Sequence, residues 1–350
     1  MSSRRARWAV PAGALVVTGG VLAGSLISTA QAAPGLPART PAQLLVEVAD
    51  ATTPPLTGTV VETASFGLPS LPGTGNPTSL SSLLTGSHTI RVWYAGPRHF
   101  RLAVPQSLSE SDVIRDGSTA WLWQSTLNKV TKFALPARAP AEAVPQQPLT
   151  PQQAAQQVLA AVGPTTAVSV ASNVTVAGQA AYALILAPKD HRSLVGQVQI
   201  DVDGRNGVPL RLQVFARGAS TPAFQVGYTA IQFVTPAAAD LSFTPPAGAT
   251  VTRVNLGNGD HGQPAGTAGY STIGKDWLTV LRLPSSDLTP SGGSDRVLST
   301  LLGAATPVHG AWGSGRLLRT SLVSVLITDS GRAYVGAVQP SVLYDAAGKS

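Results

Sequence analysis

Apolar residues at every second position are the feature that most constrains the fold of this 350-residue chain. The alternation recurs in segment after segment, for example at Ile90, Val92 and Tyr94, and it indicates strands with one buried face. Turn signals such as Asp116-Gly117 and Asn206-Gly207 separate these segments and favour tight hairpins. Because successive hairpins produce neighbouring antiparallel strands, the sequence predicts a strongly curved antiparallel sheet.

Two helices with the same N-terminal signature interrupt the strands. Thr40-Pro41-Ala42-Gln43 and Thr150-Pro151-Gln152-Gln153 each place a Thr three residues before a Gln, with Pro at the first helical position. We therefore expect an amphipathic helix over about 41–52 and a second helix after Thr150 that is closed by Gly163-Pro164. The predicted fold class is α+β and mainly antiparallel β: a curved half-barrel sheet lidded by short helices, with a small C-terminal α+β domain.

Changes in composition divide the chain into four parts. Residues 1–32 join a basic start to an uncharged apolar stretch and end in Ala30-Gln31-Ala32, which predicts an export signal peptide, with an uncleaved membrane anchor as the alternative. The half-barrel is predicted over 40–254, a Gly-rich linker over 255–269 and the C-terminal domain over 270–350. We therefore expect an exported protein of the cell envelope, or one tethered to the membrane by the retained segment.

The C-terminal domain shows a mixed pattern of short strands and helices. Its expected elements are, in order, a strand near Trp277–Leu283, a helix over about 295–302, strands at Leu317–Thr328 and Arg332–Val338 joined through Ser330-Gly331, and a helix after Pro340. No internal repeat is recognisable in the chain.

Charge and composition exclude several classes of function. The formal charge is +7, but Arg4, Arg5 and Arg7 lie in the predicted signal segment and the other cations are scattered, so we expect no nucleic-acid partner. The chain has no Cys, which excludes disulfides, thiol catalysis and acylation at a cysteine. The five His are isolated, and no Ser lies in a nucleophile elbow. We therefore expect no enzymatic activity, no catalytic residue, no metal and no cofactor.

The apolar face of the predicted sheet is the candidate binding site. Two short helices are little cover for about ten strands, so we expect part of the concave face to hold an apolar ligand; the alternative is a dry core. Segment 67–87 is either a lid or a solvent-exposed insertion, and its candidate contacts are Leu80, Leu83 and Leu84. The candidate ligand-binding residues are Trp93, Phe100, Leu102, Trp121, Trp123, Phe133, Tyr182, Leu184, Leu186, Ile200 and Leu212.

Four segments within about residues 40–254 also form a recognisable series. In chain order they are Val92-Trp93 through Gly96-Pro97 to Phe100, Val113–Trp123 followed by Lys129-Val130, Leu184–Lys189, and Leu241–Val251. The series resembles the bacterial outer-membrane lipoprotein carriers of the LolA family and their relative RseB, a sigma-E regulator. The resemblance implies an open half-barrel, with Trp93, Phe100, Trp121 and Trp123 in or near its sheet.

The same resemblance implies a function. By this resemblance, the chain is similar to an extracytoplasmic carrier whose concave face holds an acyl chain of a lipoprotein or lipid. The alternative is an envelope regulator of the RseB type, which binds a membrane protein of the anti-sigma or export type through its C-terminal domain. Gly96 stands where classical carriers have an arginine tied to one-way transfer, so the direction of any cargo transfer stays open. The expected state is a monomer.

Overall fold

The computed structural model describes residues 35–67, 85–136, 139, 141–145, 147–256, 270–285 and 303–349. The predicted signal segment, most of insertion 67–87 with its lid candidates Leu80, Leu83 and Leu84, nearly all of linker 255–269 and the predicted helix 295–302 lie outside these residues. None of the helices within the described ranges has the length and apolar character that a membrane crossing requires.

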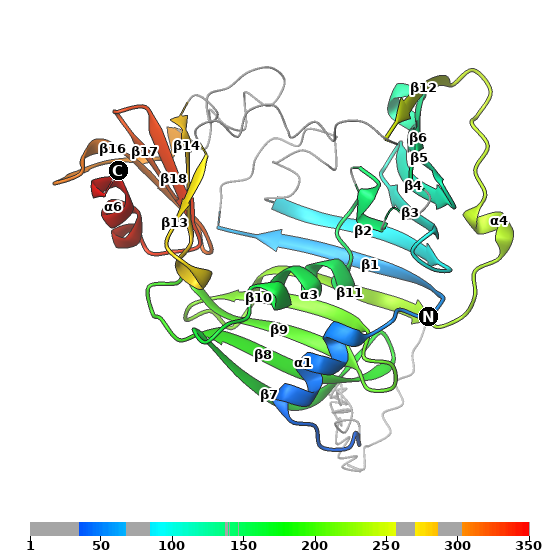
Figure 1. The fold of residues 1–350 in the computed structure, drawn as a ribbon, viewed down its shortest axis with the longest axis horizontal. Helices are drawn as coiled ribbons and strands as arrows, with labels where there is room; N and C mark the ends of the chain where they lie inside the picture. Colours follow the sequence, from blue (N-terminus) through cyan, green and yellow to red (C-terminus); the bar gives the residue numbers. More distant parts are fainter. Residues whose placement is uncertain are drawn as a thin grey trace, which may run out of the picture. The chain divides into compact units, whose positions relative to one another are not determined.

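The larger of two sheets contains twelve strands within the described residues (Figure 1). Its order is β12-β6-β5-β4-β3-β2-β1-β11-β10-β9-β8-β7, and neighbours are antiparallel except for β12, which pairs in parallel with β6. The mainly antiparallel open sheet is thus confirmed. Its strands are β1 (Leu56–Ser65), β2 (Thr85–Tyr94), β3 (His99–Pro105), β4 (Glu110–Asp116), β5 (Thr119–Gln124), β6 (Lys129–Ala134), β7 (Thr166–Val176), β8 (Gln179–Pro188), β9 (Val195–Asp203), β10 (Pro209–Ala216), β11 (Pro222–Gln232) and β12 (Thr250–Asn255).

The smaller sheet has the order β13-β14-β18-β17-β16-β15, and its neighbours are antiparallel. Its strands are β13 (Ser271–Ile273), β14 (Val280–Pro284), β15 (Thr306–Gly310), β16 (Gly313–Arg319), β17 (Ser324–Thr328) and β18 (Arg332–Gly336). The final helix predicted after Pro340 is confirmed as α6 (Pro340–Gly348).

Two expectations for this smaller sheet were wrong. The predicted strand Leu317–Thr328 is two strands, because the chain reverses at Thr320, whose hydroxyl accepts hydrogen bonds from the N–H groups of Leu322 and Val323 at 3.3 and 2.9 Å. The strand expected near Trp277–Leu283 begins only at Val280, because the 3-10 helix η3 (Asp276–Leu278) precedes it.

Helices α1 (Pro41–Asp50) and α3 (Pro151–Ala160) begin at the two predicted capping boxes. In α1, the Thr40 hydroxyl accepts the N–H of Gln43 at 3.2 Å, and the Gln43 side chain accepts the N–H of Thr40 at 2.9 Å. Both helices lie across the same face of the large sheet (Figure 1), which we call the inner face; the opposite one is the outer face. The remaining short helices of the large-sheet region are η1 (Ser125–Leu127), η2 (Ala141–Ala143) and α4 (Ala238–Leu241).

The main core runs along the inner face of the large sheet, and one part of it lies between these two helices and strands β8–β10. Leu44 and Val48 of α1 and Ala154 and Ala155 of α3 are buried against the inner face of the sheet. The sheet residues beneath them are Tyr182, Leu184, Leu186, Ile200 and Leu212, all at most 2% exposed. Full burial of such a side chain stabilises the fold by about 1.5–3 kcal/mol. This half of the inner face is therefore filled by the protein's own helices.

Candidate functional site

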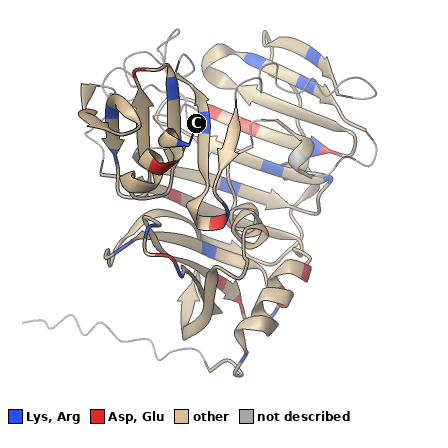
Figure 2. Cartoon of the chain, turned by 60° about the vertical axis from the view of Figure 1, so that its left-hand side comes forward, with Lys and Arg blue, Asp and Glu red and all other residues tan. Residues whose placement is uncertain are grey.

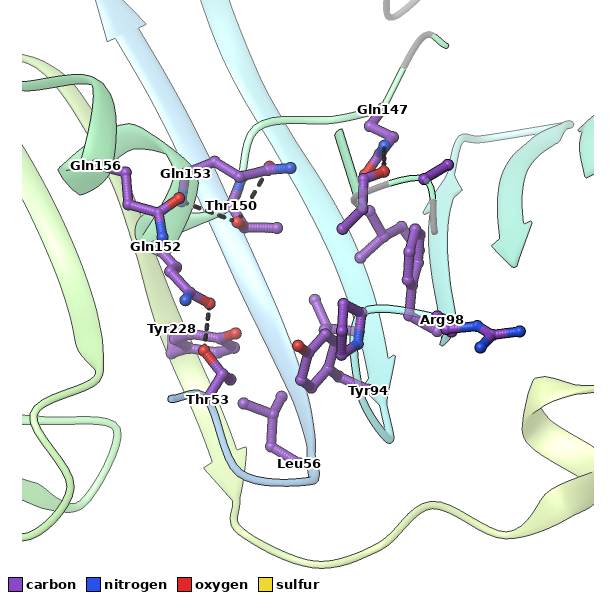
Figure 3. A pocket seen from close by; sticks show the side chains of 16 residues that line it. Thr53, Leu56, Tyr94, Arg98, Gln147, Thr150, Gln152, Gln153, Gln156 and Tyr228 are labelled. Carbon is purple, nitrogen blue, oxygen red and sulfur yellow. Dashed lines mark hydrogen bonds between the residues drawn. The ribbon is translucent and has the colours of Figure 1, made fainter. Parts of the chain in front are cut away.

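A pocket of about 540 Å³ opens on the inner face, between α3 and strands β1, β2, β3 and β11 (Figure 3). Its volume falls within the range of about 300–1,000 Å³ typical of small-molecule sites. Sheet residues form an apolar floor, and Thr and Gln side chains contribute to the rim. The lining residues are Thr53, Leu56, Val92, Tyr94, Pro97, Arg98, Phe100, Leu102, Ala139, Ala141, Gln147, Thr150, Gln152, Gln153, Gln156 and Tyr228.

The strand register builds the floor. Leu56 of β1 lies opposite Tyr94 of β2, and Tyr94 lies opposite Phe100 of β3. Val92 and Leu102 form the next pair on the same face. Because directly opposed residues of an antiparallel pair share a face, these side chains converge on one apolar surface. The alternation that predicted the strands therefore also produces the floor of the pocket.

Tyr228 of β11 closes the floor on the side opposite Tyr94 (Figure 3). Its ring needs Gly58, because a Cβ at that position would lie 2.9 Å from the Tyr228 Cδ1 atom and 2.7 Å from the carbonyl oxygen of Ala230. Burial, with a smaller contribution from Tyr94, raises the pKa of the Tyr228 hydroxyl. The hydroxyl thus stays neutral and offers an uncharged hydrogen-bonding group at the pocket.

The described residues between β6 and α3 (136, 139, 141–145 and 147–149) cover part of the inner face beside the pocket; we call them the connector. Arg115 of β4 is fully buried on the inner face, and its guanidinium donates to the carbonyl oxygens of Ala139 at 2.6 Å and Gly117 at 3.2 Å. Gln147 closes the connector turn by donating to the carbonyl oxygens of Ala141 and Val144 at 2.6 and 2.8 Å. The pocket is the gap left between this connector and α3.

Charged groups are sparse at the pocket. Among the described residues that line it, Arg98 is the only charged one, and Figure 3 shows its guanidinium turned away from the floor. Lys and Arg are scattered over both sheets (Figure 2). No group of three or more His, Asp or Glu side chains converges as a metal site would require, within the ranges that the structure describes.

Eight of the predicted site residues fall into three groups. Phe100 and Leu102 line the pocket. Phe133 lies on the inner face opposite Ala120, outside the pocket lining. The third group is the core beneath α1 and α3, which comprises Tyr182, Leu184, Leu186, Ile200 and Leu212.

The expected concave placement of three tryptophans was wrong. Trp93 lies opposite Arg101 and is thus on the outer face, because its neighbours Val92 and Tyr94 occupy the inner one. Trp121 and Trp123 are also on the outer face, where their rings lie 6.1 and 6.5 Å from that of Phe243. An offset of one residue moves a side chain to the opposite side of a sheet. Aromatic clustering in the sequence identified the strands but not the face.

Sequence reasoning missed several lining residues. The sequence analysis did not propose Leu56, Val92, Tyr94 or Tyr228 as site residues. The alternation of Ile90, Val92 and Tyr94 nevertheless indicated that these three side chains share one face of the sheet. Gln152 and Gln153 of α3 were recognised only through the helix cap, and Gln156 was not recognised, because their position beside a pocket depends on how α3 packs on the sheet.

Comparisons with protein-family models and with curated protein sequences gave no match. Among solved structures, MucB in the Pseudomonas aeruginosa MucA/MucB complex is similar over 88% of this chain and 96% of that chain, with 17% identity and a TM-score of 0.44. An uncharacterised conserved protein from Thermus thermophilus is similar over 61% and 98%, with 13% identity and a TM-score of 0.35. A LolA superfamily protein from Nitrosomonas europaea is similar over 59% and 99%, with 10% identity and a TM-score of 0.25. The LolA superfamily, which the sequence motifs resemble, is thus among the structures found.

Proposed function

We propose that this protein is an extracytoplasmic binding or carrier protein that holds the acyl chain of a lipid or lipoprotein in the pocket between α3 and the connector. The observation that carries the proposal is the pocket of about 540 Å³ on the inner face, whose floor includes Leu56, Val92, Phe100 and Leu102. These four side chains are only 1–4% exposed, so the floor is closely packed from below and the open space lies above it. An open apolar cavity with a polar rim suits a long hydrocarbon chain whose polar end stays near solvent.

The energetics fit a carrier. Each buried methylene contributes about 0.8 kcal/mol, so a chain of about sixteen carbons offers on the order of 13 kcal/mol before costs. Loss of motion on binding removes several kcal/mol of this. The pocket lies at the surface between two covering segments, so a bound chain has a way out. Retention and release are then both possible for the same ligand.

The test is to extract lipid from the purified protein and to measure native mass spectra before and after titration with palmitoylglycerol. We expect an added mass of one lipid that the extraction removes and the titration restores. Ala141→Trp places a bulky side chain in the pocket and should abolish binding. Ala160→Trp adds the same side chain at an exposed position at the end of α3, outside the lining, and should leave binding intact. A wild-type mass that stays lipid-free throughout would contradict the proposal.

A second candidate is a regulator that binds a membrane protein through the smaller sheet. It is favoured by β15, a largely exposed strand at the edge of that sheet. Edge strands carry backbone groups that can pair with an extended segment of a partner. A photo-crosslinker at Val308 of the full chain, activated in cells, should capture a membrane protein; crosslinks confined to this chain would argue against the candidate.

A further inference from the structure

We propose that Gln153 of α3 is a ligand-binding residue, and that its side-chain Nε2 donates a hydrogen bond to an uncharged oxygen, such as an ester or amide carbonyl, at the polar end of the bound acyl chain. This inference rests on the proposed function and names the class of ligand. A pocket with this hydrogen-bond donor should bind neutral acyl esters and amides more tightly than free fatty acids or cationic amphiphiles.

The first step is the orientation of the Gln153 amide. The backbone N–H of Thr150 can only donate, and it lies 3.1 Å from the Gln153 Oε1 atom. The Thr150 hydroxyl also contacts Oε1 at 3.1 Å. The oxygen of this amide is therefore fixed as the acceptor of the helix cap, and the NH₂ group is the part that the cap does not use.

The second step is where that NH₂ group lies. Gln153 lines the pocket, and Figure 3 shows its side chain extending from α3 on the pocket side, with its oxygen bonded to Thr150. The neighbouring Gln152 has a matching arrangement, because its Oε1 atom accepts a hydrogen bond from the hydroxyl of Thr53. Gln156 follows one turn later on the same rim. α3 thus presents a short row of amides to a ligand on the apolar floor.

The third step is charge. The described lining contains no Asp or Glu, so a cationic head group would find no counter-ion there. Arg98 is the one cation of the described lining, and its guanidinium points away from the floor (Figure 3). A carboxylate near Gln153 would lose hydration without gaining an ion pair, whereas a carbonyl needs only one donor. The donor set therefore matches a neutral acceptor.

The identical capping boxes of α3 and α1 allow a test variant and a matched control variant. Natural capping boxes carry Glu or Gln at the third position, so Gln153→Glu keeps the acceptor for the Thr150 N–H and replaces the pocket-facing NH₂ donor with a carboxylate oxygen and its negative charge. Gln43→Glu makes the same change in the same box on α1, outside the pocket lining. The probes are palmitoylglycerol, ionised palmitic acid, and an alkyl-pyrene that has no oxygen.

For the wild-type protein we expect palmitoylglycerol to bind more tightly than palmitic acid. Gln153→Glu should weaken palmitoylglycerol about tenfold, the effect of one lost hydrogen bond of about 1.4 kcal/mol, and leave the alkyl-pyrene unchanged. Gln43→Glu should match wild type for every probe. Circular dichroism of both variants checks that the helices persist.

Three outcomes overturn the inference. Equal palmitoylglycerol affinity in Gln153→Glu and wild type would remove the role of Gln153 while leaving the proposed function in place. Tighter wild-type binding of palmitic acid than of palmitoylglycerol would contradict the neutral-acceptor class. An equal loss in Gln43→Glu would assign the effect to helix capping. Failure of every probe, alkyl-pyrene included, to bind wild type would instead reject the proposed function itself.

Discussion

Trp123 of β5 lies directly opposite Asp112 of β4, and both side chains are on the outer face of the large sheet. Its neighbour Leu122 occupies the inner face, opposite Val113. The cluster of tryptophans is therefore separated from the pocket by the thickness of the sheet. Replacing one of these rings removes no surface that a ligand on the inner face would touch.

We predict that Trp123→Leu leaves the dissociation constant for palmitoylglycerol within about twofold of wild type. Phe100→Leu, on the floor of the pocket, should raise it roughly fourfold, the equivalent of one buried methylene. Isothermal titration of the two variants under identical conditions makes the comparison. Equal weakening in both variants would contradict the assignment of faces.

Much of the fold could be predicted because its signals are local. Both capping boxes lie where the sequence placed them, since Thr, Pro and Gln act within one helical turn. The hairpins at Asp116-Gly117 and Asn206-Gly207 join the expected strands. The reversal at Thr320 was missed because its turn uses hydroxyl chemistry in place of Gly or Asn.

The site could be predicted only in part, because it depends on packing between distant segments. Phe100 and Leu102 were found from strand alternation. The sequence could not show how much of the inner face α1 and α3 would cover. Leu184 and Ile200 have the same alternation as Phe100 and Leu102 and belong to the same buried cluster, but only Phe100 and Leu102 line the pocket. The cover supplied by the connector depends on Arg115, and no local pattern reveals that a lone arginine will be buried.

We predict that Arg115→Met loosens the connector. The substitution removes charged hydrogen bonds to the carbonyl oxygens of Ala139 and Gly117, each worth about 1.5–3 kcal/mol. The free energy of unfolding should fall by about 2 kcal/mol or more, and amide exchange in residues 139–149 should become faster. Arg98→Met is the matched control and should change the unfolding free energy by less than about 0.5 kcal/mol. Unchanged exchange in Arg115→Met would show that the connector is held by other contacts.

We predict that Leu184→Ala destabilises the protein without changing ligand affinity. Leu184 is fully buried beneath α1 and α3, and truncation of such a residue costs about 2–5 kcal/mol. Urea denaturation measures the loss. The control is Leu108→Ala, because Leu108 is fully exposed and its truncation should cost less than about 0.5 kcal/mol. A large loss of palmitoylglycerol binding in folded Leu184→Ala would place the ligand against the core residues instead.

We predict that ionisation of the Asp112 carboxyl group makes the stability of the folded protein depend on pH. Burial raises the pKa of its carboxyl group from 3.8 to about 7, a hydrogen bond with Glu110 acts in the same direction, and Arg101, which contacts the carboxylate, opposes both. The folded protein therefore holds this proton over a pH range in which the unfolded chain has released it. The resulting stabilisation is complete below the unfolded value and is lost as pH rises through about 7.

Asp112→Asn isolates this contribution, because the amide resembles the protonated acid in shape and does not titrate. Burial also raises the pKa values of Glu62 and Asp201, so the wild-type melting temperature should fall between about pH 4 and pH 7 for more than one reason. The Asp112→Asn profile should be flatter than that of wild type over this window, and the exposed control Asp50→Asn should follow wild type. Parallel profiles for Asp112→Asn and wild type would mean that the Asp112 carboxyl is already ionised in the folded protein throughout the window, with Arg101 outweighing the cost of burial.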